Sequence, residues 1–162
     1  AVGTAAVFTP RTAAPQGGWP VIAWAHGTVG LGDDCTPSAN ARSPRDNEYL
    51  SHWLDQGYAV VAADYVGLGT PGLMSYLNAR TTAHGIVDAV IAAHHMDLPL
   101  SPRWAVVGQS QGGGAAVARG ARPLFLPEPE SCQFSADTDY SWRERPGCQA
   151  SAGRSAGRIH SR

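Results

Sequence analysis

The chain has 162 residues, which is enough for one domain with a substantial hydrophobic core. Its formal net charge of −1 gives no electrostatic reason to expect nucleic acid as a partner. No apolar run approaches the length of a membrane span, so we expect no stable membrane insertion. The chain starts at Ala1 with neither a methionine nor a signal-peptide core, so we expect that a leader has been removed or that the N-terminus is incomplete.

Short apolar runs alternate with helical patterns through the first 118 residues. The predicted strands are the runs 4–8, 21–25, 58–63 and 104–107. The last three of these runs are apolar throughout, which is typical of strands buried on both faces. The spacing of apolar residues predicts helices over 45–56 and 79–95, and small residues favour a third helix over 113–118. We therefore expect an α/β fold, with a mostly parallel sheet and flanking helices.

The last apolar run leads into the motif Gly108-Gln109-Ser110-Gln111-Gly112, which has the form G-x-S-x-G. Glycine two positions before and after the serine fits a sharp strand-to-helix turn, because a Cβ there would collide with the neighbouring strand or helix. Such a turn presents the Ser110 hydroxyl at its tip, and the amide of Gln111 faces the oxyanion that forms when the serine attacks a carbonyl. We therefore predict that Ser110 is a nucleophile. The alternative is a Gly-rich connector with an ordinary surface serine.

Two further motifs come directly after predicted strands, His26-Gly27-Thr28 and the segment 64–69. In an open parallel sheet the chemistry collects where the carboxyl ends of the strands meet, so we expect both motifs to share an edge with Ser110. The amide of Thr28 is the predicted partner of the Gln111 amide, and we interpret His26 as structural support for this oxyanion hole. The alternative for His26 is a loop histidine that caps its own turn.

Three segments together resemble the α/β-hydrolase superfamily, and in particular its secretory lipase and esterase family in bacteria and fungi: VIAWAHGTVGLGDDCTPS, VVAADYVGLGTPG and VVGQSQGG. The resemblance covers residues 4 to about 118, with the motifs in the family's order. It implies an α/β-hydrolase fold with Ser110 as nucleophile and with Thr28 and Gln111 as sources of the oxyanion amides. It also implies a secreted or cell-envelope protein that acts on a small-molecule or lipid ester, and it implies no metal and no organic cofactor.

After residue 118 the character of the sequence changes. Residues 119–162 contain few large aliphatic side chains, seven of the twelve arginines, and turn-rich Ser/Gly stretches. We therefore expect a partial hydrolase domain over 1–118, truncated after the Ser110 turn, and an irregular, poorly packed tail over 119–162. Disorder and an out-of-frame translation of a GC-rich gene would both give a tail of this composition.

A serine nucleophile needs a histidine base that a carboxylate orients, and in this fold the acid and then the histidine follow the serine along the chain. The one downstream histidine is His160, with Asp137 or Asp139 as its acid, and it would serve only if the tail folded back over Ser110. We expect the acid and the histidine to be missing, which predicts a serine carboxylic-ester hydrolase of impaired activity. One alternative is an inactive hydrolase-fold fragment with at most a binding role. Another is peptidase or acyltransferase chemistry on the same scaffold.

The remaining histidines give no strong metal signal. His94, His95 and Asp97 lie at a helix end and point in different directions, and we expect them to be solvated. His84 and Asp88 are one helical turn apart, and we prefer a surface pair to a metal site.

The cysteines are too few for a disulfide framework. Cys35, Cys132 and Cys148 can form one bridge and leave one thiol, and the sequence does not choose the pairing. Half a hydrolase sheet would also expose apolar edges, so we expect self-association.

Overall fold

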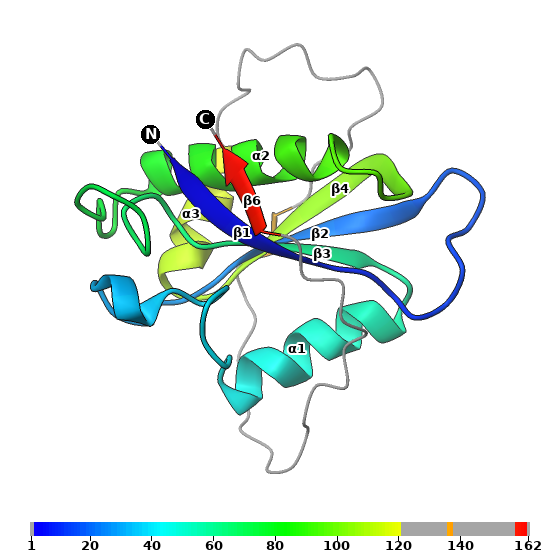
Figure 1. Ribbon diagram of the computed structural model, residues 1–162, viewed down its shortest axis with the longest axis horizontal. Coiled ribbons are helices and arrows are strands. Elements are labelled where there is room, and N and C mark those ends of the chain that lie inside the picture. The colour runs from blue at the N-terminus through cyan, green and yellow to red at the C-terminus, as the bar shows by residue number, and fades with distance from the viewer. Residues whose placement is uncertain (1, 121–135, 138–157, 162) are drawn as a thin grey trace.

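A six-stranded sheet with helices on both faces forms the body of the molecule (Figure 1). The computed structural model describes residues 2–120, 136–137 and 158–161. Within these ranges the strands are β1 (Gly3–Phe8), β2 (Trp19–Ala25), β3 (Ala59–Ala63), β4 (Leu100–Gly108), β5 (Ala136–Asp137) and β6 (Arg158–Ser161). The helices are α1 (Pro44–Asp55), α2 (Ala79–His94) and α3 (Gln111–Gly120), with a 3-10 helix η1 (Asp33–Cys35) before α1. No helix in this part of the chain is long and apolar enough to cross a bilayer.

The strands lie in the order β5-β4-β2-β3-β1-β6. β2 pairs in parallel with both β3 and β4, and β4 pairs in parallel with β5. β1 is antiparallel to β3 and to β6. The centre of the sheet is therefore parallel, as predicted, and the antiparallel pairs lie on one side. Because β2, β3 and β4 are parallel neighbours, the loops that follow them leave the sheet at the same edge.

The two faces of β2 pack against different helices. Val21, Ala23 and Ala25 belong to the core beneath α2 and α3, whereas Ile22 and Trp24 belong to the core against α1. Figure 1 shows α1 and α2 on opposite sides of the sheet. All five side chains are at most 2% exposed, which explains why this strand has no alternation of polar and apolar residues. Burying one valine or isoleucine side chain in this way contributes about 1.5–3 kcal/mol.

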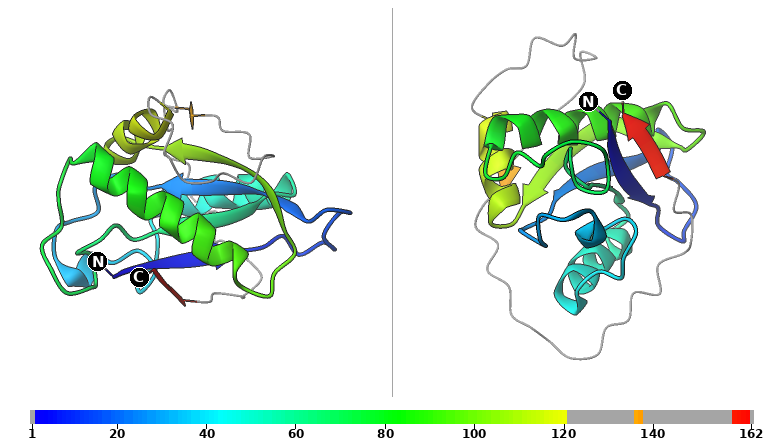
Figure 2. Two further views of the ribbon diagram at one scale, coloured as in Figure 1. Left: turned by 90° about the horizontal axis from the view of Figure 1, so that it is seen from above. Right: turned by 60° about the vertical axis from the view of Figure 1, so that its left-hand side comes forward.

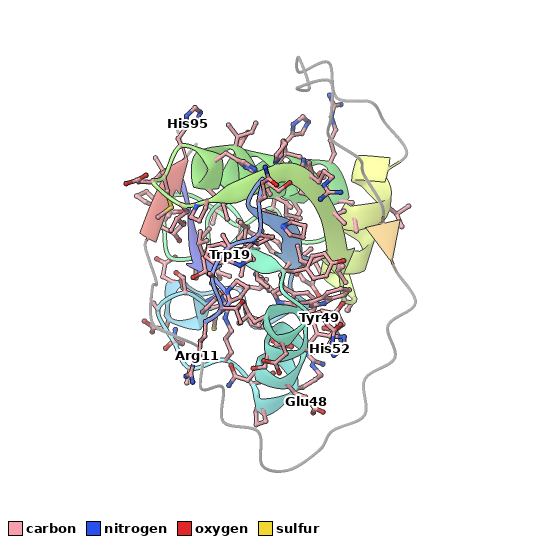
Figure 3. The ribbon with its side chains drawn as sticks, turned by 90° about the vertical axis from the view of Figure 1, so that its right-hand side faces the viewer. Arg11, Trp19, Glu48, Tyr49, His52 and His95 are labelled. Carbon is pink, nitrogen blue, oxygen red and sulfur yellow. The ribbon has the colours of Figure 1, made fainter. Side chains whose placement is uncertain are left out.

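Aromatic rings fill the core between α1 and the sheet. The rings of Trp24 and Tyr49 are 4.8 Å apart between centroids, and Trp53 meets the rings of Tyr49 and Tyr58 edge-on at 5.9 and 5.3 Å. Figure 3 shows Tyr49 near the sheet and Glu48 on the outer side of α1. The helical spacing of the apolar residues predicted the helix that carries Tyr49 and Trp53.

Strand β4 begins earlier than the sequence predicted, because its first part contains a bulge. Trp19 of β2 pairs with Leu100, but Val21 pairs with Trp104. Between these two pairs β4 therefore advances by four residues and β2 by only two. Pro102 lies in the extra stretch, where the missing N–H of a proline does not interrupt a ladder of hydrogen bonds. Proline therefore marks a bulge here, and the strand continues through it.

Two short segments of the predicted tail form strands at opposite ends of the sheet. β5 lies beside β4, and β6 lies beside β1, as Figure 2 shows for the latter pair. Residues 121–135 and 138–157 lie outside the described residues, and Asp139, Cys132 and Cys148 lie there too. An irregular tail therefore stays a prediction, as does any disulfide to Cys35, which is a free thiol within the described part of the chain.

We predict that removing the N-cap of α1 weakens the fold measurably. The Ser43 hydroxyl accepts a hydrogen bond from the Asp46 amide at 3.1 Å, and Pro44 follows at the first helical position. Ser43→Ala should lower the free energy of unfolding by about 1 kcal/mol, because that amide loses its acceptor. Urea unfolding measures this change. Ser51→Ala, inside the same helix, is the control and should leave stability unchanged or slightly raise it. Equal effects of the two variants would contradict the prediction.

Candidate active site

Ser110 lies in a sharp turn between β4 and α3. Its φ angle is +53°, in the left-handed region that side chains other than glycine rarely adopt, and its side chain is exposed. β4 ends at Gly108 and α3 begins at Gln111, so two residues make the whole connection. The predicted strand–turn–helix arrangement is therefore confirmed. The catalytic role of Ser110 is taken up below as a proposal.

The glycines on both sides of the turn allow three segments to meet at close distance. A Cβ on Gly108 would overlap the backbone of Gly112, and a Cβ on Gly112 would overlap the carbonyl groups of Ala25 and His26. Helix α3 thus starts directly against the carboxyl end of β2. Both glycines are therefore needed to avoid a collision with the neighbouring strand or helix, as predicted from the sequence.

The loop after β2 is joined to the Ser110 turn by hydrogen bonds. The Gln109 amide donates to the carbonyl of Ala25 at 3.1 Å, and the Thr28 hydroxyl donates to the side-chain oxygen of Gln111 at 3.3 Å. Thr28 is also 3.2 Å, hydroxyl to hydroxyl, from Tyr76. The structure therefore brings together the two residues predicted to supply oxyanion amides, and one of them, Gln111, directly follows Ser110.

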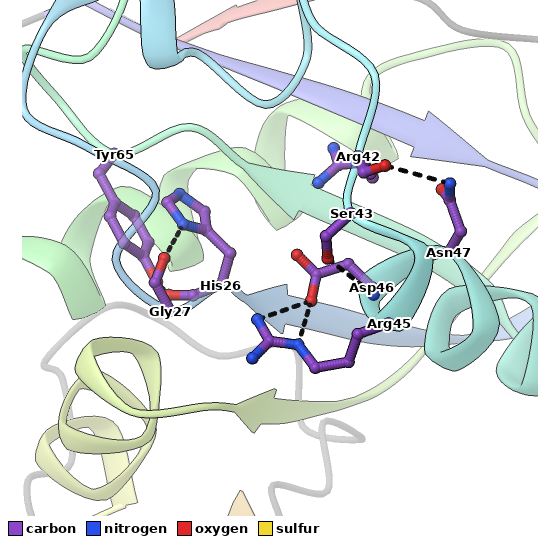
Figure 4. Close-up of polar contacts among 8 residues, drawn as sticks. All are labelled: His26, Gly27, Arg42, Ser43, Arg45, Asp46, Asn47 and Tyr65. Atoms are coloured by element: carbon purple, nitrogen blue, oxygen red, sulfur yellow. Dashed lines mark hydrogen bonds and ion pairs between the residues drawn. The ribbon is translucent and has the colours of Figure 1, made fainter. Parts of the chain in front are cut away.

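His26 is buried beneath this loop and is held by its neighbours (Figure 4). Its Nδ1–H donates to the carbonyl of Gly27 at 2.6 Å, and its ring stacks on that of Tyr65 with centroids 4.0 Å apart. The Tyr65 hydroxyl donates to the His26 carbonyl. These contacts fix the orientation of the His26 ring, which can therefore restrain the backbone of the loop after β2. The bond to Gly27 is compatible both with support of an oxyanion hole and with the capping alternative.

Burial controls the charge of His26. Desolvation disfavours the imidazolium and lowers the pKa of His26 below its ordinary value of 6.5, and the charge of Arg42 acts in the same direction. The Gly27 carbonyl and the carboxylates of Asp64 and Asp46 oppose the shift without overcoming it. His26 is therefore neutral near pH 7, and its Nε2 finds no hydrogen-bond partner among the described residues.

The segment 64–69, which follows β3, lies at the same edge of the sheet as the Ser110 turn, as predicted. Its acidic residue, Asp64, has a structural role. Asp64 is fully buried and accepts hydrogen bonds from the Thr4 hydroxyl and the Ser38 amide, each at 2.8 Å. Asp33 accepts a bond from the Gly69 amide at 3.0 Å. These bonds tie the loop before α1 to the loop after β3. Asp64 therefore anchors the edge on which the site is built.

Sequence reasoning missed a group of charges near His26. Arg42 lies over the ring of Phe8, with its guanidinium carbon 5.5 Å from the centroid, and burial lowers its pKa. Arg45 pairs with Asp46 at 3.1 Å (Figure 4). No local pattern marks an arginine for burial, because the ring and the carboxylates near it come from other segments of the chain.

Among the residues considered as metal ligands, His94 contacts backbone carbonyl groups. The two ring nitrogens of His94 are 2.8 and 2.9 Å from the carbonyl oxygens of Val90 and Ser101, so this residue links α2 to β4. His95 lies at the outer surface beyond the end of α2 (Figure 3). Within the described ranges no three His, Cys, Asp or Glu side chains gather as metal ligands would.

Asp137 and His160, two of the downstream residues considered for a triad, lie on strands at opposite ends of the sheet. Asp137 pairs with Val107, one strand from the Ser110 turn. His160 pairs with Thr4, on the far side of β2, β3 and β1. Four strand spacings separate β4 from β6, which is about 19 Å. The backbone thus places Asp137 near Ser110, and it does not place His160 there.

Comparison with known families and structures gives a consistent result. The sequence model of the secretory lipase family matches residues 41–130, which is more than half of the chain and includes the Ser110 turn. No curated protein sequence matches the chain.

Solved structures with the same fold are esterases and lipases. The rice cell wall degrading esterase LipA from Xanthomonas oryzae is 26% identical, with a TM-score of 0.56, over 74% of this chain and 34% of LipA. Lipase A from Candida antarctica in its closed state is 22% identical, with a TM-score of 0.60, over 84% of this chain and 33% of that protein. The second likeness shows the fold alone. The fold is therefore of the α/β-hydrolase type, and the chain spans about a third of the length of these proteins.

We predict opposite effects for two alanine substitutions in α3. Gly112→Ala should lower the free energy of unfolding by about 3 kcal/mol or prevent folding, because its Cβ would overlap backbone that cannot move aside. Gly114→Ala should raise it by about 0.5–1 kcal/mol, since its Cβ meets only the Ala79 side chain at 4.0 Å and alanine favours a helix. Urea unfolding of both variants compares them, and a tolerated Gly112→Ala would contradict the described turn.

We predict that His26 makes the fold less stable in mild acid. The unfolded chain binds a proton at His26 near pH 6.5, whereas the folded chain binds it only at lower pH. The unfolded state therefore holds more protons in this window, and the free energy of unfolding falls as the pH drops, by at most about 1.4 kcal/mol per pH unit. Urea unfolding between about pH 7.5 and about pH 5.5 should show a steeper loss for the wild type than for His26→Gln. Parallel curves would contradict the prediction.

Proposed function

This chain belongs to the secretory lipase family, and from that premise we propose that it is a serine carboxylic-ester hydrolase that forms an acyl-serine intermediate on Ser110. The conformation of Ser110 carries the proposal. Its side chain is exposed at the tip of a two-residue turn, in a left-handed conformation that the close packing of α3 on β2 imposes. A serine held this way has its hydroxyl free for attack and a helix N-terminus behind it.

The proposed chemistry assigns roles to the residues around the turn. The Ser110 oxygen attacks the ester carbonyl, and the carbonyl oxygen becomes negatively charged. The amides of Gln111 and Thr28 stabilise that charge, and the hydrogen bond between their side chains supports this assignment by keeping the two residues together. Collapse of the tetrahedral intermediate expels the alcohol and leaves the acyl-serine, which water then hydrolyses.

The proton of Ser110 needs an acceptor, and this requirement limits the proposed rate. His26 is committed to Gly27 and Tyr65, and the backbone of His160 lies at the far end of the sheet. We therefore propose impaired turnover for the chain as it stands. The same observation supports the second candidate function, an inactive hydrolase-fold fragment with at most a binding role.

The proposed substrate is a small-molecule or lipid ester. Membership of the secretory lipase family supports an ester substrate and a secreted protein. LipA, to which the chain is similar, is described as degrading rice cell walls. Self-association stays a prediction.

We predict that Ser110→Ala abolishes both acylation and hydrolysis. A fluorophosphonate probe should label the wild type and Ser51→Ala equally, and it should not label Ser110→Ala. Hydrolysis of a short-chain chromogenic ester by Ser110→Ala should fall to the rate measured without protein, because the nucleophile is gone. Equal labelling of wild type and Ser110→Ala would contradict the assignment of Ser110. Labelling without turnover above the Ser110→Ala background would favour the inactive fragment.

A further inference from the structure

We propose that Tyr65 is a positioning residue, which fixes the backbone of His26 and Gly27 and thereby aims the Thr28 amide at the carbonyl oxygen of an ester bound at Ser110. That the Thr28 amide is oriented toward an ester rests on the proposed function. The fixing of the loop rests on geometry alone.

Tyr65 reaches across from the loop after β3 to the loop after β2. Its side chain is 3% exposed, and its hydroxyl donates to the His26 carbonyl at 2.5 Å, across 39 positions of sequence. Its ring also stacks on the His26 ring, with the two planes only 16° apart (Figure 4). One side chain thus restrains both the backbone and the ring of His26.

His26 passes this restraint to the next peptide group. Its Nδ1–H holds the Gly27 carbonyl at 2.6 Å. The Gly27 carbonyl and the Thr28 N–H belong to one planar trans peptide, so they point in opposite directions. Whatever fixes the Gly27 carbonyl therefore fixes the direction of the Thr28 N–H. Tyr65 acts on that amide through His26, without touching it.

The conformation of Tyr65 itself is unusual, and its surroundings hold it. Its φ angle is +33°, which is sterically unfavourable for a bulky residue. Its carbonyl accepts from the Leu68 amide at 3.1 Å, and the preceding Asp64 amide donates to Thr4 at 2.8 Å. Burial raises the pKa of the Tyr65 phenol, so the hydroxyl remains a donor at every ordinary working pH.

The test removes only the hydroxyl. Tyr65→Phe keeps the ring and its stacking on His26, and Tyr58→Phe, just before the start of β3, is the matched control. The first readout is the NMR order parameter of the Thr28 N–H vector, which does not depend on activity. It should fall from about 0.85 to below about 0.6 in Tyr65→Phe, whereas the Val87 vector in α2 should not change. The second readout is the rate of fluorophosphonate labelling at Ser110, which should fall about tenfold. Where the wild type turns over an ester, kcat should fall with KM unchanged.

Each outcome decides one part of the proposal. An unchanged Thr28 order parameter in Tyr65→Phe overturns the fixing of the loop. A lowered order parameter with labelling as fast as in wild type and Tyr58→Phe overturns the link to catalysis. A lowered order parameter with slowed labelling supports both. A wild type that fails to label at Ser110 overturns the proposed function and the ester half of this proposal, while the order parameter still decides whether Tyr65 fixes the loop.

Discussion

The contact between the first turn of α3 and the carboxyl end of β2 is the constraint on which the site depends. Gly112 lies against the Ala25 carbonyl so closely that no side chain fits between them. With the helix start fixed there and β4 paired to β2 as far as Gly108, two residues must reverse the chain. Ser110 accepts a left-handed conformation as a result, which costs about 1–2 kcal/mol. Burial of Ala115 and Ala116, two small residues of the same helix, helps to offset that strain.

Strain collects at one edge of the sheet. The non-glycine residues with positive φ in the described ranges are Tyr65, Leu77 and Ser110, and all three lie in loops that follow the carboxyl ends of β3 and β4. The interior has the opposite character, since β3 is buried along its whole length. The loops at this edge can keep unfavourable backbone conformations because hydrogen bonds join them to each other. Asp64 and Asp33, for example, join the loop before α1 to the loop after β3.

What the sequence could predict was encoded locally. The strands and helices follow from apolar runs and helical spacing, and the Ser110 turn follows from two glycines at fixed offsets. What it could not predict depends on distant partners. Tyr65 meets His26 only because β2 and β3 are neighbours in the sheet, and β5 and β6 are too short to show any periodicity. The predicted run 104–107 starts after Pro102, and only the pairing of β4 with β2 shows that this proline lies in a bulge within the strand.

His26 shows that this edge of the sheet is not optimised for stability alone. A phenylalanine at this position would stack on Tyr65 and leave no nitrogen buried without a partner, whereas the histidine leaves its Nε2 unpaired within the described structure. Leaving such a group unsatisfied costs about 1–3 kcal/mol. What the imidazole adds is one N–H, directed at the Gly27 carbonyl. The unpaired nitrogen of His26 and the strained backbone of Tyr65 both lower the stability of the fold. In return they fix the orientation of one peptide group, the one between Gly27 and Thr28, whose N–H belongs to Thr28.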